Sequence, residues 1–339
     1  MDLIPEDTKY AVLGLETNRV AADLPDMVEL PNGFLALRHL PFKVPDHWRE
    51  WVGSLEFSRI EENGLYLFAR APTTRPQDSD SEDQALIRSV NRLYYSLLLS
   101  VPFFAHDHQG IMLAGSRDTA APRVNHREQY PTLHRIPYTP RPDITEAVLR
   151  DAAELTQSIV ALTTVAPFER MSRANRIFYR GLQEPYCDAR TLAFVRTVEA
   201  FLLPPVGGAR EAFIDRTRTF VGEGQADAVS QMYDIRSAVV HLHDPAKLLP
   251  RIGRRERTLI LLKRCIQAEA LARFCLLRLP QRPQAYTHFQ DDQTVENFWR
   301  MDAEQRGVIW GPALDLQECL AELKDARVDD ETLGLSPDG

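Results

Sequence analysis

Apolar and polar residues follow two different periods along the chain, and the change falls near residue 142. Before that point, short apolar runs and alternating stretches indicate strands, at 33–40, 52–60 and 65–71. After it, apolar residues recur at helical spacing in one segment after another, which is typical of amphipathic helices. The pattern predicts a mainly α protein, α+β overall, with a small mixed α/β domain over 1–142 before a helical bundle over 143–280.

Turn-forming residues refine the first domain. Asn63-Gly64 favours the positive φ angles of a tight turn, so residues 52–71 are predicted to form a β-hairpin. Residues 72–83 are rich in proline, serine and acid, and should form an exposed loop. Helical spacing predicts a helix over 84–101, ended by Pro102. Five prolines within 116–142 predict an irregular connection.

Helix signals dominate the rest of the chain. Asp143, with Glu146 three residues later, predicts a capping box at the start of the first helix. Further helices are predicted at 169–183, 188–203, 209–221, 226–243 and 255–279. The acidic segment 281–339 should add helices at 292–303 and 312–326 and fray from about residue 329.

Composition narrows the class of protein. A chain of 339 residues that is 44% hydrophobic can bury a core and suggests two domains. No apolar run approaches the roughly 18 residues that span a bilayer, and the first ten residues are polar and acidic, unlike a signal peptide. A cytoplasmic protein without a membrane partner is expected. The four cysteines form no CxxC pair, which predicts buried free thiols rather than metal ligands or disulfides.

Charge is distributed unevenly. Residues 1–143 carry 15 Lys/Arg and 20 Asp/Glu (−5), residues 144–280 carry 20 and 15 (+5), and residues 281–339 carry 5 and 13 (−8). A polyanionic partner such as RNA should therefore meet the middle of the chain. Arginine is abundant everywhere, so the swing can also arise from composition alone.

The segment 231–245, QMYDIRSAVVHLHDP, ends a predicted helix in this basic part. It places Arg236 five residues before His241. With 35 Arg (40 Lys+Arg minus 5 Lys) and 9 His, chance alone gives about one such pair per chain. The residues around the pair must therefore supply the evidence.

Those residues resemble the HEPN superfamily, most closely its Apea-like branch. Members of that branch typically read YDIRSxxVH, and this chain has YDIRSAVVH over 233–241. Residues 190–203 and 213–216 are also similar to the branch, and the resemblance covers about 170–280. Leu242 departs from the pattern, because members usually have Gly directly after the histidine. The resemblance implies a HEPN-like helical bundle that forms a homodimer, with both motifs lining one cleft, and an endoribonuclease acting as a toxin or anti-phage effector.

Helix geometry sets a condition on this pair. Five residues turn Arg236 and His241 about 140° apart on a continuous helix. The two can converge if the helix ends between them, or if a second copy brings its own pair alongside. Ser237 and Asp234 lie on the stripe of His241, and one of them could hold the imidazole tautomer.

An arginine and a histidine suit metal-independent RNA cleavage, in which the 2′-hydroxyl attacks the adjacent phosphorus. Histidine can accept or donate a proton, and arginine can neutralise the charge that accumulates on the phosphorane. The predicted catalytic residues are Arg236, His241 and Ser237. The predicted substrate-binding residues are Tyr233, His243, Arg251, Arg254 and Arg255. No cofactor or metal is expected.

Several alternatives remain open. Arg236 can instead form an ion pair, for instance with Glu199, His241 can be a solvated helix-end residue, and Tyr233 can belong to the core. The domain as a whole can then be a non-catalytic RNA-binding or dimerisation scaffold. His106, Asp107 and His108, with His126 and His134, fit no metal-ligand spacing. The first domain is expected to bind an unknown trigger, and a small-molecule sensor would require a deep polar pocket within 1–143.

Overall fold

The computed structural model describes residues 3–17, 19–74, 79–101, 110–117, 122–134, 136, 142–165, 169–248 and 252–325. These residues form thirteen α-helices, four short 3-10 helices and one six-stranded antiparallel sheet, so the protein is mainly α. None of the helices described combines the length and apolar character needed to cross a membrane.

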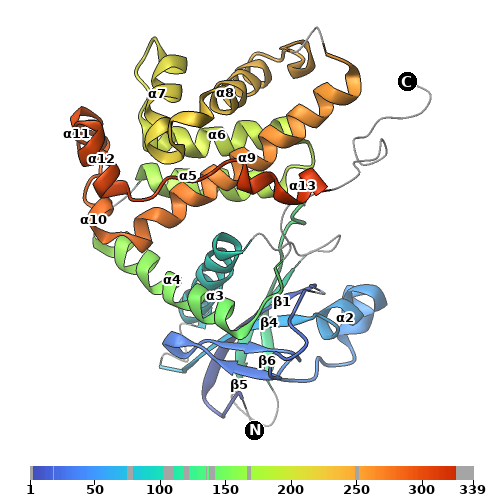
Figure 1. Ribbon diagram of the computed structural model, residues 1–339. Helices are drawn as coiled ribbons and strands as arrows, with labels where there is room; N and C mark the ends of the chain where they lie inside the picture. The colour runs from blue at the N-terminus through green and yellow to red at the C-terminus, as the bar shows by residue number, and fades with distance from the viewer. Residues whose placement is uncertain are drawn as a thin grey trace. The chain divides into compact units, whose positions relative to one another are not determined.

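The chain divides into two compact units. One comprises residues 1–133 with 141–158, and the other comprises 134–140 with 159–339 (Figure 1). The boundary expected near residue 142 precedes helix α4 (Glu146–Val165), whereas this division falls inside α4.

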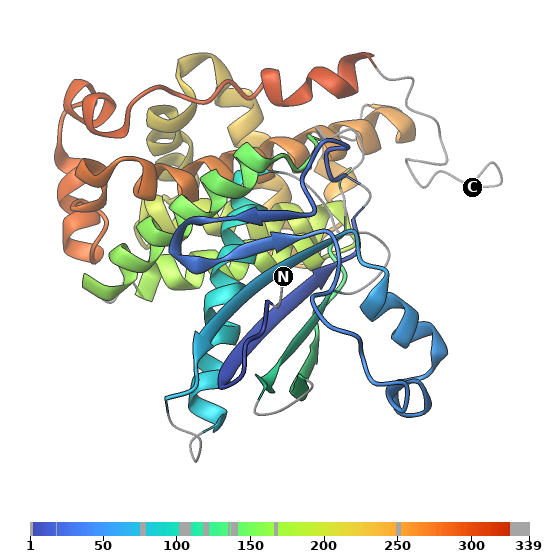
Figure 2. The same ribbon diagram turned by 90° about the horizontal axis from the view of Figure 1, so that it is seen from below.

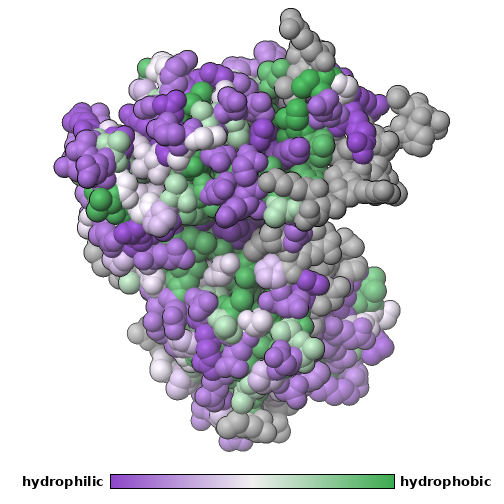
Figure 3. Space-filling view, viewed as in Figure 1, coloured by the Kyte–Doolittle hydropathy of each residue, from purple (hydrophilic) through white to green (hydrophobic). Residues whose placement is uncertain are grey.

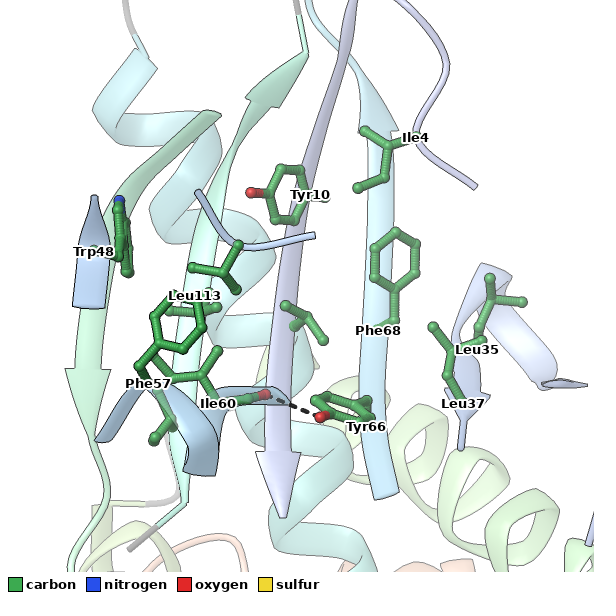
Figure 4. Close-up of a cluster of buried hydrophobic side chains, with 13 residues drawn as sticks. Ile4, Tyr10, Leu35, Leu37, Trp48, Phe57, Ile60, Tyr66, Phe68 and Leu113 are labelled. Carbon is green, nitrogen blue, oxygen red and sulfur yellow. Dashed lines mark hydrogen bonds between the residues drawn. The ribbon is translucent and has the colours of Figure 1, made fainter. Parts of the chain in front are cut away.

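The first unit is built on a sheet with strand order β2-β3-β4-β1-β5-β6. Its strands are β1 (Thr8–Leu15), β2 (Met27–Glu29), β3 (Leu35–Leu37), β4 (Leu65–Pro72), β5 (Ile111–Arg117) and β6 (Arg123–Gln129). The apolar strand β1 is central and entirely buried between β4 and β5. Helix α3 (Ser79–Ser100) packs along β1, β4 and β5 (Figure 2). Tyr10 of β1 lies in a core cluster with Trp48 and Phe57 (Figure 4), and Val12 belongs to the same cluster.

The predicted hairpin over 52–71 is wrong in its first half. Helices α1 (Trp48–Val52) and α2 (Ser54–Glu61) occupy that part, and only the second strand is confirmed, as β4. In α2 the buried residues Phe57 and Ile60 are three apart, while Leu55 is exposed. Burial thus follows one face of a helix instead of one face of a strand.

Asn63-Gly64 makes a turn between a helix and a strand instead of between two strands. The Tyr66 hydroxyl of β4 donates a hydrogen bond to the Ile60 carbonyl at 2.9 Å and fastens the end of α2 to the strand (Figure 4). Gly64 is required by a close approach, because a Cβ there would lie 2.0 Å from the Thr17 carbonyl oxygen. The dipeptide therefore signals a turn without specifying a hairpin.

The helix predicted over 84–101 begins earlier, at Ser79. Its early start shortens the exposed loop predicted over 72–83, of which residues 75–78 lie outside the described part. Glu82 and Asp83 belong to α3 and approach the buried Lys9 ammonium at 3.1 and 3.6 Å. Two acidic residues that the sequence pattern assigned to an exposed loop thus neutralise a lysine in the central strand.

Two further expectations near residue 142 are wrong. The proline-rich connection contains β6, a polar edge strand whose few apolar residues leave no strand pattern to detect. Asp143 does not cap the helix that follows, because it pairs with Arg19 at 3.3 Å. Thr145 supplies the cap, since its hydroxyl accepts a hydrogen bond from the Val148 amide at 3.3 Å.

The second unit consists of helices. Helices α5 (Glu169–Gln183) and α7 (Ala209–Val221) have the predicted bounds. The ends of three other helices lie within three residues of the predicted ends: α6 (Cys187–Leu202), α8 (Ala226–Val240) and α9 (Arg254–Gln281). Helix α6 packs against α5, α7, α8 and α9 and forms the centre of the unit. Its sequence is apolar on most sides, as this central position requires.

The acidic C-terminal segment packs onto this unit as far as residue 325. It contains α10 (Pro283–Tyr286), α11 (Asp292–Arg300), α12 (Ala303–Trp310) and α13 (Ala321–Asp325). The fully buried Trp310 stacks on Phe220 of α7 with 4.2 Å between ring centroids, and the Trp299 indole donates to the Phe201 carbonyl at 3.0 Å. The helix predicted at 292–303 is confirmed as α11. The helix predicted at 312–326 is wrong over most of its length, and residues from 326 onward lie outside the described part.

Candidate functional site

Helix α8 ends at Val240, and a left-handed residue closes its last turn. The His243 amide donates to the Ala238 carbonyl at 2.8 Å, and the Leu242 amide donates to the Val239 carbonyl at 3.1 Å. These two hydrogen bonds form a Schellman motif, whose left-handed position is usually a glycine. Leu242 occupies that position with φ 55°. The leucine that departs from the family pattern therefore adopts the backbone conformation for which glycine is favoured.

Arg236 is held by the neighbouring helix α6. Its Nη2 atom lies 3.1 Å from Oε1 and 3.2 Å from Oε2 of Glu199. Its guanidinium also lies over the ring of Tyr233, 5.3 Å from the centroid. The alternative of an ion pair between Arg236 and Glu199 is thereby confirmed.

Tyr233 is a core residue. Its side chain is buried, and its ring packs against Phe213 of α7 with 5.2 Å between centroids. A base could reach this ring only if the surrounding helices moved. The predicted stacking of a base on Tyr233 stays a prediction.

His241 follows the last residue of α8 and is exposed. Its ring lies 6.0 Å from that of His243, which is also exposed. No hydrogen bond joins His241 to Arg236 in the described part of the chain. The end of the helix therefore does not by itself bring the two side chains together, and convergence through a second copy stays a prediction.

The residues expected to orient the imidazole have different surroundings. Asp234 forms an ion pair with Arg210 of α7, whose Nε and Nη2 atoms donate hydrogen bonds to the two carboxylate oxygens at 2.8 and 3.0 Å. This hydrogen-bonded pairing raises the pKa of Arg210. Ser237 is half-buried, and its carbonyl accepts the His241 amide at 3.1 Å. Asp234 thus ties α8 to α7 instead of acting on His241, and Ser237 remains the predicted orienting residue.

Basic residues gather at the end of the unit that carries His241. The 3-10 helix η3 (Pro245–Leu248) contacts both α8 and α9, so the first turn of α9 lies near the last turn of α8 (Figure 1). Arg254 and Arg255 open α9, and both are exposed. They lie where a phosphate backbone running past His241 could be bound. Arg251, also predicted to bind substrate, falls outside the described residues.

Apolar side chains are exposed around the same helix end. Leu242 retains 94% of its exposure, and Val240 and Leu248 retain 45% each. Hydrophobic surface is also visible beside the first turns of α9 (Figure 3). Three large apolar side chains are thus left in water within nine residues.

Part of the basic charge of the middle segment is not on the surface. Arg190 of α6 is buried and forms an ion pair with Glu269 of α9 at 3.5 Å. Arg210 and Arg236 are paired with carboxylates as described above. The net excess of five positive charges is unchanged by these pairs, because Glu269, Asp234 and Glu199 belong to the same segment, but three of its arginines already have carboxylate partners. Only the fold shows these pairs, because each partner lies on another helix.

The described residues contain no cluster of histidine, cysteine and carboxylate groups suited to a metal ion. His126 lies 3.7 Å from Glu128 on the same edge strand. His106, Asp107 and His108 are outside the described residues.

Comparison of the chain with protein-family models, with curated proteins and with solved structures returns no match.

Proposed function

We propose that the protein is a metal-independent endoribonuclease of HEPN type, with Arg236 and His241 as its central pair. The observation that carries the proposal is the end of α8, where an exposed imidazole lies among exposed apolar side chains and near two exposed arginines. The motif that resembles the Apea-like branch ends at this point of the chain. RNA is the substrate class that this combination of histidine and arginine suits.

The chemistry needs one proton acceptor and one proton donor. A neutral histidine takes the proton of the 2′-hydroxyl as it attacks the adjacent phosphorus, and a protonated histidine gives a proton to the leaving 5′-oxygen. Two copies of the chain supply two His241 side chains, one for each task. Arg236 stabilises the pentacoordinate phosphorus only after its guanidinium exchanges the Glu199 carboxylate for the phosphate.

A second copy of the chain is the partner proposed for the exposed apolar surface. Val240 and Leu242 flank His241, so a two-fold contact through them would bring two imidazoles and their arginines to one groove. The cleavage of cellular RNA must be restrained, and we assign that role to the first unit, which would bind a trigger in the cytoplasm. A role as a toxin or anti-phage effector follows from the family resemblance.

The test is RNA cleavage by the purified full-length chain in excess EDTA. Arg236→Ala and His241→Ala should each reduce cleavage by about 100-fold or more, the typical effect of removing a proton-transfer group or a charge-stabilising donor. The products should carry 2′,3′-cyclic phosphate and 5′-hydroxyl ends. Arg300→Ala and His288→Ala replace the same residue types elsewhere in the unit and should leave cleavage unchanged. Unchanged cleavage in either motif variant, with folding intact, would remove that residue from the mechanism.

One observation favours a different function. The Arg236 guanidinium already has a carboxylate partner, as expected of a structural residue, and this suits a non-catalytic RNA-binding or dimerisation scaffold. Such a scaffold would bind RNA or self-associate and leave the RNA intact in EDTA. Sedimentation combined with the cleavage assay separates the two functions, because Leu242→Asp should disrupt a dimer in both cases and abolish cleavage only for the enzyme.

A further inference from the structure

Two cysteines that are distant in the sequence meet between α6 and α9. Cys187 is the first residue of α6, and Cys265 lies in the middle of α9. The ion pair between Arg190 and Glu269 joins the two helices. Cys187 lies one turn before Arg190 on α6, and Cys265 lies one turn before Glu269 on α9. The two thiols lie close enough for each to influence the pKa of the other. Both cysteines are free, as predicted, and Cys265 is buried, whereas Cys187 is only half-buried.

The two thiols have unequal surroundings. Cys187 is half-buried, and hydrogen bonding with Cys265, opposed by burial and aided by Arg190, lowers its pKa. Its place in the first turn of α6 adds the positive end of a helix dipole, which also favours a thiolate. Cys265 has no exposed surface, and burial raises its pKa. Cys187 is thus the partly exposed residue whose thiolate is favoured, and Cys265 is a buried neighbour whose thiol is favoured.

We propose that Cys187 is a site of oxidation by hydroperoxides and that Cys265 converts the oxidised sulfur to a disulfide. The Cys187 thiolate attacks hydrogen peroxide, the O–O bond breaks, and the products are a sulfenic acid on Cys187 and hydroxide, which is protonated to water. The Cys265 sulfur then attacks the sulfenic sulfur, an S–S bond forms, and the S–O bond breaks. The leaving hydroxide takes the Cys265 proton as a second water, so two thiols lose two electrons and one peroxide gains them.

Oxidation of Cys187 favours the attack by Cys265 that follows it. Burial disfavours a Cys265 thiolate, and the hydrogen bond and charge of Cys187 disfavour it further. When Cys187 becomes an uncharged sulfenic acid, the effect of its charge disappears, while Arg190 and the Thr191 hydroxyl still stabilise the Cys265 thiolate. The resulting disulfide would join the first turn of α6 to the middle of α9. The inference does not depend on the proposed ribonuclease activity.

Cys319 provides a matched control within the same unit. It is also half-buried, but burial, with Asp315 and Glu318, raises its pKa to about 11. It should therefore react more slowly than Cys187 with any reagent that needs a thiolate.

The test treats the reduced full-length protein with hydrogen peroxide, blocks remaining thiols by alkylation and maps the peptides without reduction. A peptide joined through Cys187 and Cys265 should appear and should disappear with dithiothreitol. Cys265→Ser should stop at a sulfenic acid on Cys187 that dimedone traps, and Cys319→Ser should behave like the wild type. At neutral pH, Cys187 should react at least about tenfold faster than Cys319, because the pKa of Cys187 is lowered and that of Cys319 is raised.

Two results would overturn the proposal. One is the absence of any peptide joined through these two cysteines in peroxide-treated wild-type protein whose fold is intact by circular dichroism. The other is oxidation of Cys319 as fast as that of Cys187. Both are read on the wild-type chain, so neither depends on the folding of a variant.

Discussion

Replacement of Glu269 by glutamine should destabilise the helical unit by about 3 kcal/mol, because it leaves a buried arginine without its counter-charge. Glu269 of α9 accepts from Arg190 at 3.5 Å and from Arg273 at 2.7 Å. The Arg190 and Glu269 side chains keep only 1% and 4% of their exposure. Water therefore cannot replace the lost carboxylate.

The magnitude follows from two opposing effects. Unit charges about 4 Å apart attract by about 4 kcal/mol at an effective dielectric constant of about 20. Desolvation offsets much of this in the intact pair, but the desolvation cost of Arg190 remains when only the carboxylate charge is removed. Breaking one partner of a buried pair typically costs about 3–5 kcal/mol, and glutamine should fall at the lower end because its amide oxygen still accepts a hydrogen bond.

Alkylation of Cys275 measures this loss in the helical unit alone. Cys275 lies in α9 and is fully buried, so its thiol reacts when that unit opens. Where closing is faster than alkylation, a loss of about 3 kcal/mol should speed labelling by about 100-fold. Mass spectrometry of the labelled peptides separates Cys275 from the other cysteines.

Glu296→Gln is the matched control. Glu296 also pairs with an arginine four residues later, Arg300, at 2.9 Å, but both side chains are largely exposed. Its loss should cost less than about 1 kcal/mol and change labelling by less than about fivefold. Equal labelling rates in Glu269→Gln and Glu296→Gln would refute the reasoning, because burial would then not govern the cost. Replacing Arg190 and Glu269 together by methionine and leucine should recover most of the loss.

Three other changes have definite expected outcomes. Leu242→Gly should stabilise the isolated chain by about 1 kcal/mol in chemical denaturation, because a left-handed conformation costs an L residue about 1–2 kcal/mol; an unchanged or lower stability would contradict this account of the helix end. Gly64→Ala should destabilise the first unit by about 2 kcal/mol or more, whereas Gly224→Ala, where an added Cβ meets nothing within 4 Å, should cost far less in thermal unfolding. Hydrogen bonding from Thr74 lowers the pKa of Glu82 from 4.5 to about 2. The ionised Glu82 carboxylate therefore contributes its full stability above pH 4.5, and this contribution is lost as the pH falls toward 2. In an acid titration followed by circular dichroism, Glu82→Gln should lose less stability than the wild type.

The helices of the second unit are predictable because their cause is local. In α5 and α7, apolar residues recur at helical spacing between clear breaks, and the structure keeps the predicted bounds. The first unit is harder to predict. The edge strand β6 is polar and forms because β5 offers it a partner, and α1 and α2 occupy a stretch whose apolar residues also fit an alternating pattern.

The candidate site divides in the same way. Sequence locates Arg236 and His241 at the close of a helix, and it raises both the catalytic and the structural alternative for the arginine. Only the fold shows that Glu199 binds Arg236 and that Arg210 binds Asp234, because each partner lies on another helix. The same holds for the meeting of Cys187 with Cys265.

By itself the sequence determined the helical character of the second half, the place of the breaks and the end of α8 as the position of the motif, because these depend on contacts within a few residues. The tertiary structure decided which charges are exposed, which are neutralised and which thiols touch. Those properties arise from side chains brought together across helices, where burial removes the solvent that would otherwise screen or hydrate them.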